Sequence, residues 1–317
     1  MYLKKKSWYP RLREHWYKFY KALSIMSTEH LTFSSLEDEL PSLNAQDAVL
    51  PPIDPKKLAW QDLKEGIQKR QIWFMLAYQD IKARYRRSVL GPLWLTLSMA
   101  ITVYSMGYLY SQLFNVELQH YYPFLVAGML GWSLILTLVI DYTDGFLHAH
   151  ALIKQIKLPY SLYIHRIVAR NLLIFFHNLL VMVPIYIFFH QDAPVNWCTL
   201  LLLPALAILY LNAFLYGTVI AMVSARYRDV SQIIKSLMQV IFFLTPVMWQ
   251  PQGLLGKKHI FVEVNPFYAF LELIRAPLLG KLPTQNNLTV ILGITLLGFL
   301  LYSKIFTRFR SRIIYWL

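Results

Sequence analysis

The 317-residue sequence has little charge and almost no cysteine. Charged residues make up 15% of the chain and hydrophobic residues 56%, whereas soluble domains average about 25% charged and about 45–50% apolar residues. The single cysteine, Cys198, cannot form a disulfide within the chain, so no covalent framework holds the fold. A chain this apolar is expected to fold inside a lipid bilayer. About six membrane crossings would leave little room for a soluble catalytic domain.

Two familiar motifs are also missing. The phosphate-binding loop GxxxxGK[ST] does not occur, because the nearest stretch, 253–258, has the wrong spacing and a lysine in place of the Mg²⁺-binding hydroxyl. If the protein uses ATP, another chain therefore binds the nucleotide. The basic start of the chain does not lead into an uncharged apolar core, since Arg11, Arg13 and Glu14 interrupt it, so we expect no cleaved signal peptide.

Apolar runs long enough to cross a bilayer dominate the remainder. They predict six membrane-spanning helices at 93–113, 124–140, 172–189, 200–223, 233–249 and 288–306. Lys235 and Lys304 lie near one end of the fifth and the sixth run, where long aliphatic stems let the ammonium groups reach the membrane surface. The predicted fold class is an all-α integral membrane protein.

The distribution of Lys and Arg predicts the orientation of these spans. The net charge is +14, and 27 of the 31 basic residues precede the first span, follow the second or fourth, or end the chain. The loops after the first and third spans have none, and the loop after the fifth has four. This asymmetry places both termini in the cytoplasm. It also explains the positive charge without nucleic-acid binding.

The first 55 residues form a predicted cytoplasmic extension, followed by a six-span domain over 56–317. The stretch 7–26 has the periodicity of an interfacial helix, although a solvated tail remains an alternative, and the acidic, aperiodic stretch 29–55 is interpreted as a linker. From 55 to 90 we expect an amphipathic helix along the inner membrane surface, with Ile67, Phe74, Tyr78, Ile81 and Tyr85 on one stripe, which Gly91 and Pro92 end.

The loop after the fifth predicted span is too polar to cross a membrane and too apolar for water. Prolines punctuate it, and the stretch 261–279 carries Glu263, Glu272 and Arg275. Short re-entrant helices, buried against protein or lining a wet cavity, satisfy both constraints. Glu272 and Arg275 are three residues apart and are expected to pair on one helix face.

Two constellations have possible chemical roles. Asp141, Asp144 and His148 follow the second span on one predicted helical face, where they could bind a divalent metal or act as acid and base, or could simply be the polar end of a helix. Aromatic side chains on the first and fifth spans, which ordinary packing would also explain, suggest a conduit lined by rings. These are Tyr104, Tyr108, Phe242, Phe243 and Trp249.

Six ordered segments resemble a known family. They are DIKARYRRSVLGPLW at 80–94, YPFLVAG at 122–128, LIKQIKLP at 152–159, RYRD at 226–229, TPVMW at 245–249 and NPF at 265–267. Together they are similar to the permeases of type-2 ABC exporters for polysaccharides, in the lipopolysaccharide O-antigen branch. The similarity extends over roughly 55–317.

The resemblance implies a half-transporter in the bacterial inner membrane, in which two copies pair and each docks on a separate subunit that binds ATP and Mg²⁺. The implied substrate is a glycan on undecaprenyl pyrophosphate. The resemblance makes the helix before the first span an interface helix and assigns three groups of residues. The coupling helix includes Leu152, Lys154, Lys157, Pro159 and Tyr160; the periplasmic gate includes Pro266, Phe267, Glu272 and Arg275; pyrophosphate would arrive at Lys82, Arg84, Arg86 and Arg87.

Other interpretations stay open at this point. The four basic residues before the first span could be topogenic charge only. A membrane-embedded glycosyl or phosphoryl transferase would use Asp141, Asp144 and His148 and require a divalent metal, and a passive channel would conduct without ATP. The residues fit an O-antigen, a capsule or a teichoic-acid polymer equally. We expect no catalytic residue, metal or cofactor on this chain if the exporter interpretation holds.

Overall fold

The computed structural model describes residues 54–86, 88–250 and 258–317. The described residues belong to one compact unit, Asp54–Leu317, and no strand occurs among them. The interfacial helix expected at 7–26, residues 29–53 of the linker expected at 29–55, and the expected phosphate contact of Arg87 lie outside the described residues. The boundary between an N-terminal extension and a permease domain therefore stays a prediction.

The described residues are almost entirely helical. The bounds of the helices are α3 Pro55–Gln68, α4 Arg70–Arg84, α5 Leu93–Phe114, α6 Leu118–Thr143, α7 Gly145–His148, α8 His150–Gln155, α9 Tyr160–Asn178, α10 Met182–Phe188, α11 Leu202–Arg226, α12 Asp229–Leu244, α13 Lys258–Glu263, α14 Pro266–Leu278, α15 Gln285–Phe309 and α16 Ile313–Trp316. The 3-10 turns η1 (Leu179–Val181), η2 (Trp197–Leu201) and η4 (Arg310–Arg312) join or extend these helices.

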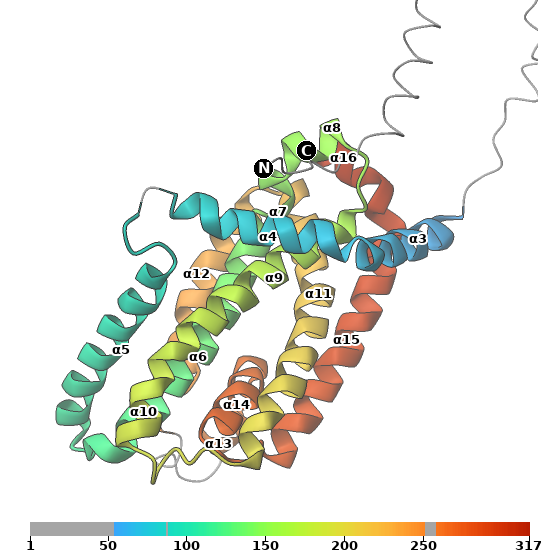
Figure 1. Ribbon diagram of the computed structural model, residues 1–317. Coiled ribbons are helices and arrows are strands. Elements are labelled where there is room, and N and C mark those ends of the chain that lie inside the picture. Colours follow the sequence, from blue (N-terminus) through green and yellow to red (C-terminus); the bar gives the residue numbers. More distant parts are fainter. Residues whose placement is uncertain (1–53, 87, 251–257) are drawn as a thin grey trace, which may run out of the picture. The chain divides into compact units, whose positions relative to one another are not determined.

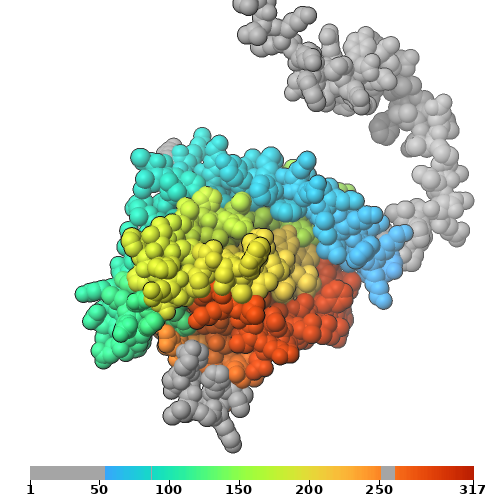
Figure 2. Space-filling view, turned by 60° about the horizontal axis from the view of Figure 1, so that its bottom comes forward, coloured from blue at the N-terminus to red at the C-terminus, as the bar shows by residue number. Residues whose placement is uncertain are grey.

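The long helices α5, α6, α9, α11, α12 and α15 run side by side, while α3 and α4 lie across one end of them (Figure 1). The short helices α7, α8 and α16 and the C-terminus lie at that same end, called here the α4 end, and α13 and α14 lie toward the opposite end. The space-filling view shows α3 and α4, in blue and cyan, extending along one margin of the helical body (Figure 2).

Four segments are long and apolar enough to cross a membrane: Leu118–Thr143, Tyr160–Phe188, Trp197–Arg226 and Gln285–Trp316. They confirm four of the six predicted spans and a multi-pass membrane protein. The segment that corresponds to the third predicted span begins at Tyr160, well before the expected residue 172. Neither α5 nor α12 is among the four. With 16 residues, α12 is shorter than the roughly 20 that a bilayer requires, whereas α5 has 22 residues, several of them tyrosine, serine or threonine.

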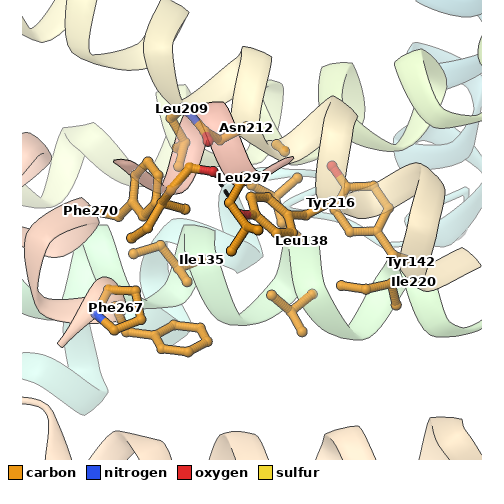
Figure 3. A pocket seen from close by; sticks show the side chains of 14 residues that line it. Ile135, Leu138, Tyr142, Leu209, Asn212, Tyr216, Ile220, Phe267, Phe270 and Leu297 are labelled. Carbon is orange, nitrogen blue, oxygen red and sulfur yellow. Dashed lines mark hydrogen bonds between the residues drawn. The ribbon is translucent and has the colours of Figure 1, made fainter. Parts of the chain in front are cut away.

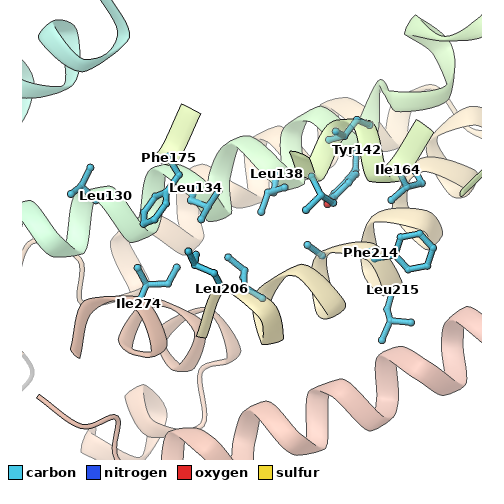
Figure 4. Packing of buried hydrophobic residues seen from close by; sticks show 14 of the residues in the cluster. Leu130, Leu134, Leu138, Tyr142, Ile164, Phe175, Leu206, Phe214, Leu215 and Ile274 are labelled. Atoms are coloured by element: carbon cyan, nitrogen blue, oxygen red, sulfur yellow. The ribbon is translucent and has the colours of Figure 1, made fainter. Parts of the chain in front are cut away.

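The core lies where α6 packs between α9, α11 and α14. Leu130, Leu134 and Leu138 recur along α6, and Figure 4 shows Leu134 and Leu138 directed toward α11 and α14, where Leu206 and Ile274 lie. All five side chains are at least nine-tenths buried. Leucines at i, i+4 and i+8 form a continuous apolar stripe along α6, which explains why α6 is the central helix.

The predicted interface helix at 55–90 is two helices. The chain leaves helical geometry at Lys69, where φ is −80° and ψ is 32°, and α4 begins at the next residue. The expected stripe is not one buried face, because Ile67, Phe74 and Tyr78 are exposed whereas Ile81 is buried. The buried face of α3 instead contains Ala59, Asp62 and Gly66, and small residues there permit close packing against α9.

Candidate functional site

A buried carboxylate joins three segments at the α4 end. Asp62 of α3 accepts hydrogen bonds from the backbone N–H groups of Tyr160 and Ser161, each at 2.9 Å, and from the guanidinium Nε of Arg310 at 2.9 Å. Its side chain has no exposed area. Because Pro159 precedes α9 without offering a capping side chain, Asp62 supplies the negative charge that the first turn of a helix favours. Helix α3, the start of α9 and the C-terminal tail thus meet at one residue.

A second polar network connects α4, α9 and α6. Asp80 of α4 accepts two hydrogen bonds from Arg166 of α9, one of them from Nε at 2.8 Å, and lies 3.3 Å from a guanidinium nitrogen of Arg170. Arg170 also donates to Asp141 of α6 at 2.8 Å. The four side chains are each less than 30% exposed, so the opposite charges largely neutralise one another away from water.

The residues expected in the coupling helix divide into an outer and an inner group. Lys154 of α8 and Lys157 of the following loop are exposed, and Leu152 is half-buried. Pro159 is buried and Tyr160 is half-buried, with its ring 6.1 Å from that of Phe146. The exposed lysines are free to meet another chain, whereas Pro159 and Tyr160 fix the loop to the body of the protein beside Asp62.

The basic cluster at the end of α4 is exposed where it is described. Lys82 and Arg84 occupy the last turn of α4, where cations are favourable next to the helix C-terminus, and Arg86 follows. Across the described segments, none of these three side chains forms an ion pair. Their positive charges therefore remain available to an anion, or serve only to hold this end of the protein at the membrane surface.

The aromatic residues proposed as a conduit form two separate groups. Tyr104 is half-buried on α5 and donates to the backbone oxygen of Val181 at 2.7 Å, while Tyr108, one turn later, is 61% exposed. The second group lies on α12 and just after it. Phe242 and Phe243 have ring centroids 5.4 Å apart, and Trp249 donates to the backbone oxygen of Phe243 at 3.2 Å. Within the described part of the chain, no ring contact joins the two groups.

The expected ion pair between Glu272 and Arg275 is present on α14. Arg275 of α14 is 1% exposed, and its Nε donates to Glu272 at 2.7 Å. Its Nη1 also donates to the backbone oxygen of Pro246 at 2.8 Å, and its guanidinium carbon lies 4.2 Å from the ring centroid of Phe124. The prediction of an i, i+3 pair is confirmed, and the pair additionally fastens α14 to the segment after α12 and to α6.

The remaining expected gate residues begin α14. Pro266 is the first residue of the helix, and the side chain of Asn265 caps it by accepting from the backbone N–H of Phe267 at 2.9 Å. Asn265 also donates to the Thr245 hydroxyl at 3.1 Å, and the Phe267 ring lies 6.3 Å from that of Trp132. The start of α14 is thus tied to the end of α12 and to α6.

Asp141, Asp144 and His148 do not share one continuous helix face, contrary to expectation. Helix α6 ends at Thr143, and Asp144 adopts φ −110° and ψ 5° before α7 begins. Each carboxylate has a cation, since Asp141 pairs with Arg170 and Asp144 with Lys235 at 3.0 Å. No group of three metal-ligating side chains occurs in the described ranges. This arrangement stabilises a helix end and does not favour the transferase interpretation.

Comparisons with known proteins agree with this arrangement. The profile of the ABC-2 type transporter family matches residues 70–279, about two thirds of the chain. The chain belongs to the ABC-2 type transporter family. The O-antigen export system permease protein RfbA of Myxococcus xanthus is 23% identical over 250 residues, which are 77% of this chain and 94% of that protein. Two permeases of the same name from Klebsiella pneumoniae are 19% identical over 74% of this chain and 92% of theirs.

The family match covers α4 to α14 of this ABC-2 transporter chain and so includes the Asp80 network and Arg275 but not Asp62. The roles of Asp62 and Asp80 were not predicted from the sequence, because their partners Ser161 and Arg166 are 99 and 86 residues away. A signal for Arg166 and Arg170 was present. They are one helical turn apart and directly precede the apolar run at 172–189, which is the spacing of two charges on one helix face.

An apolar cavity of about 340 Å³ opens between α6, α11, α14 and α15 of the transporter. Figure 3 shows Ile135 and Leu138 of α6 near Phe267 and Phe270 of α14, with Tyr216 of α11 among them. Tyr216 donates to the backbone oxygen of Ile294 at 2.7 Å, so its hydroxyl is satisfied by protein. The cavity borders the first part of α14 at Phe267 and Phe270, whereas the Glu272–Arg275 ion pair anchors the later part of the helix.

Proposed function

We propose that this chain is the transmembrane subunit of an ATP-driven exporter that moves lipid-linked polysaccharide of the O-antigen type across the bacterial inner membrane. The family match over residues 70–279 carries the proposal, together with relatives named O-antigen export permeases that align over more than nine-tenths of their own length. As a transporter component, the chain is not itself expected to catalyse a reaction.

The proposal includes a complete assembly. Two copies of the chain pair, each bound to an ATP-binding cassette subunit that holds ATP and Mg²⁺, and the cargo is a glycan on undecaprenyl pyrophosphate. Each copy crosses the membrane six times, with α5 and α12 added to the four apolar spans, and both termini are cytoplasmic. Pairing supports the addition of α12, because an exposed apolar face with Ile233, Leu237 and Val240 can be buried against a second copy.

The proposed mechanism begins at the α4 end. Approach of the two ATP-binding subunits pushes on α8 through Lys154 and Lys157. Pro159, Tyr160 and Asp62 transmit this movement to α9 and α3, because buried contacts resist deformation. The Asp80 network then links α9 to α4 and α6. A hydroxylated polymer cannot dissolve in hydrocarbon, so the spans of both copies enclose a wet path lined by Tyr108 and Phe243.

Export also requires an entrance and an exit. Lys82, Arg84, Arg86 and Arg87 attract the pyrophosphate at the cytoplasmic surface, since guanidinium groups suit bidentate phosphate contacts. Helices α13 and α14 form the periplasmic gate, which includes Pro266 and Phe267 at the start of α14 and the Glu272–Arg275 pair that anchors it. The family match favours this exporter over a passive channel, because a channel would conduct without an ATP-binding partner.

The proposal is tested by co-purification and export in one strain. The chain is expected to co-purify with a phosphate-loop ATPase, and deletion of either chain should leave lipid-linked polymer on the cytoplasmic leaflet. The double variant Lys154→Glu/Lys157→Glu should weaken co-purification, whereas Lys281→Glu, a charge reversal in the loop after α14, should not and serves as the control. Normal surface polymer in the deletion strain would refute the proposal.

A further inference from the structure

The apolar cavity between α6, α11, α14 and α15 has a closed floor and an open rim. Leu138, Leu209 and Ala213 belong to the floor, and each is at least nine-tenths buried. At the rim, Val139 of α6 is partly exposed and Leu297 of α15 is 52% exposed. The cavity is therefore a pocket that opens at the surface of the helical body and is closed at its inner end.

The described wall of this cavity offers no polar group to a ligand. Among the described residues, three polar side chains border it. Asn212 donates to the Thr295 hydroxyl at 2.9 Å, and Tyr216 donates to the backbone oxygen of Ile294 at 2.7 Å. The hydroxyl of Tyr142 is buried and has no surface in the cavity. Such a wall suits an apolar ligand, because a sugar or a phosphate would lose its hydrogen bonds to water there.

The open rim faces the hydrocarbon of the bilayer. Leu297 lies on α15, which belongs to one of the four segments that are long and apolar enough to cross a membrane. Between residues 290 and 302, every exposed residue of α15 is leucine, phenylalanine or glycine. This face therefore has no polar surface for a wet path, and lipid chains are the molecules that meet the rim.

The size and shape of the cavity favour a flexible chain. Its volume is about 340 Å³, whereas an apolar cavity of about 150 Å³ in a soluble protein stays dry and binds benzene. Along α11 the wall extends from Leu209 to Ile220, which is roughly 16 Å at about 1.5 Å per residue. If the cavity were empty, its wall would lack van der Waals contacts along this whole length. A hydrocarbon chain restores these contacts.

We propose that this cavity binds one acyl chain of a phospholipid from the surrounding bilayer. The chain enters past Leu297 and packs on Leu138 and Ala213, while its headgroup stays at the membrane surface. Because Phe267 and Phe270 form part of the wall, the bound chain also supports the start of α14. This last consequence rests on the proposed function, in which α14 belongs to the periplasmic gate.

The closed floor distinguishes a phospholipid from the proposed cargo. A polyprenyl chain that crosses the membrane with its glycan has to leave every site that it enters. A pocket with a buried inner end gives such a chain no onward path, because Leu138, Leu209 and Ala213 block it. The closed floor therefore favours a resident lipid of the bilayer as the occupant.

Binding is measured on the full-length chain in nanodiscs of phosphatidylethanolamine, by native mass spectrometry of the phospholipid retained after transfer to detergent. Ala213→Phe fills the floor and should reduce retention about tenfold or more, because excluding about two methylene groups from the cavity has an effect of this size. Ala207→Phe is the matched control, since Ala207 is exposed on the same helix and does not line the cavity. It should retain phospholipid as the parent chain does.

The melting temperature gives a second readout of the same variants. Added phospholipid should raise the melting temperature of the parent chain in detergent, because a ligand that binds only the folded state stabilises it. Ala213→Phe should lose this response, and its melting temperature without lipid should equal or exceed that of the parent, because the ring occupies empty space.

A substitution at the rim keeps the test decisive if Ala213→Phe fails to fold. Leu297→Trp narrows the rim at an exposed position and should also reduce retention. Its control is Leu300→Trp, because Leu300 is 66% exposed on the same helix and does not line the cavity. Phosphatidylglycerol with the same acyl chains should be retained equally, since the cavity contacts the chain and not the headgroup.

Three outcomes would overturn the inference. The first is retention by Ala213→Phe and Leu297→Trp that equals retention by the parent chain. The second is retention that depends on the headgroup alone. The third is stronger retention of polyprenyl phosphate, added as a competitor, than of phospholipid, because the occupant would then be a cargo chain. Since the assay contains no ATPase and no glycan, failure of ATP-driven export would refute the proposed function without affecting these results.

Discussion

Asp62 of α3 accepts a hydrogen bond from the backbone N–H of Ser161 at 2.9 Å, although the two residues are 99 positions apart in the chain. Asp62 also accepts from Tyr160 and Arg310. The first turn of α9 therefore depends on a carboxylate from the interface segment, and the C-terminal tail neutralises that carboxylate. Helix α3 is thereby tied by buried, charged hydrogen bonds to the first turn of α9, which directly follows the loop proposed to contact the ATP-binding subunit.

Asp62→Asn should lower the free energy of unfolding by about 3 kcal/mol, because it removes the charge that pairs with Arg310 and leaves one backbone N–H group facing an amide nitrogen. Unfolding of the purified chain in detergent measures this loss. Glu65→Gln is the control, since the exposed pair of Glu65 with Lys69 at 3.6 Å should contribute less than about 1 kcal/mol. Equal stability of the two variants would show that Asp62 does not hold α9.

Gly66 marks the closest approach of α3 to α9. A Cβ atom on Gly66 would lie 2.1 Å from the Ser161 hydroxyl, so Gly66→Ala should separate the helices and destabilise the chain by about 1–3 kcal/mol. Gly293 in α15 has no atom within 4 Å of such a Cβ, and Gly293→Ala should stabilise the helix by up to about 1 kcal/mol. Opposite signs of the two changes in melting temperature are expected, and identical signs would contradict this packing.

The apolar runs predicted most helices because that information is local. The runs at 93–113 and 200–223 correspond to α5 and α11 within a few residues at each end. The start of α9 at Tyr160 was not predicted, because the charges of Arg166 and Arg170 indicated a loop before residue 172. Their charges are tolerated in a span only because Asp80 and Asp141, from other helices, neutralise them. The distant carboxylates leave no signal in the sequence, although the spacing of the two arginines by one helical turn is typical of a helix.

The site predictions show the same division between local and distant information. The Glu272 and Arg275 pair was predictable because its spacing lies within one helical turn. The break at Lys69 was not, since the periodicity continues through it and only the packing of α3 and α4 on α9 reveals two helices. The partners of Tyr104 and Arg275 on other segments likewise follow from tertiary structure alone.

Substitutions at Tyr108 and Tyr104 should affect different properties, the export rate and the stability of the chain, respectively. Tyr108→Ala is expected to slow export several-fold without altering stability, because the side chain is exposed and, in the proposed assembly, faces the polymer. Tyr104→Phe should instead lower stability by about 1 kcal/mol through loss of the hydrogen bond to Val181. Export is measured as surface polymer per assembled complex. If Tyr108→Ala exports at the parental rate, Tyr108 does not line the conduit.

Arg275 and Glu272 should show strong coupling. Arg275→Met leaves Glu272 next to an apolar side chain and is expected to destabilise the chain more than the double variant Glu272→Gln/Arg275→Met does, because a lone partly buried carboxylate is costlier than a neutral pair. A double-mutant cycle by thermal unfolding measures the coupling. Additive effects of the two substitutions would mean that the ion pair does not anchor α14.

Export itself is best measured in proteoliposomes that contain the full-length chain, its ATP-binding partner and a labelled polyprenyl diphosphate glycan. With ATP and Mg²⁺ on the side of the ATP-binding partner, the glycan should become accessible to a glycosidase on the opposite side, and a partner variant lacking its phosphate-loop lysine should abolish this. Glycan that crosses equally with that variant, or that never crosses with the intact partner, would contradict an ATP-driven exporter.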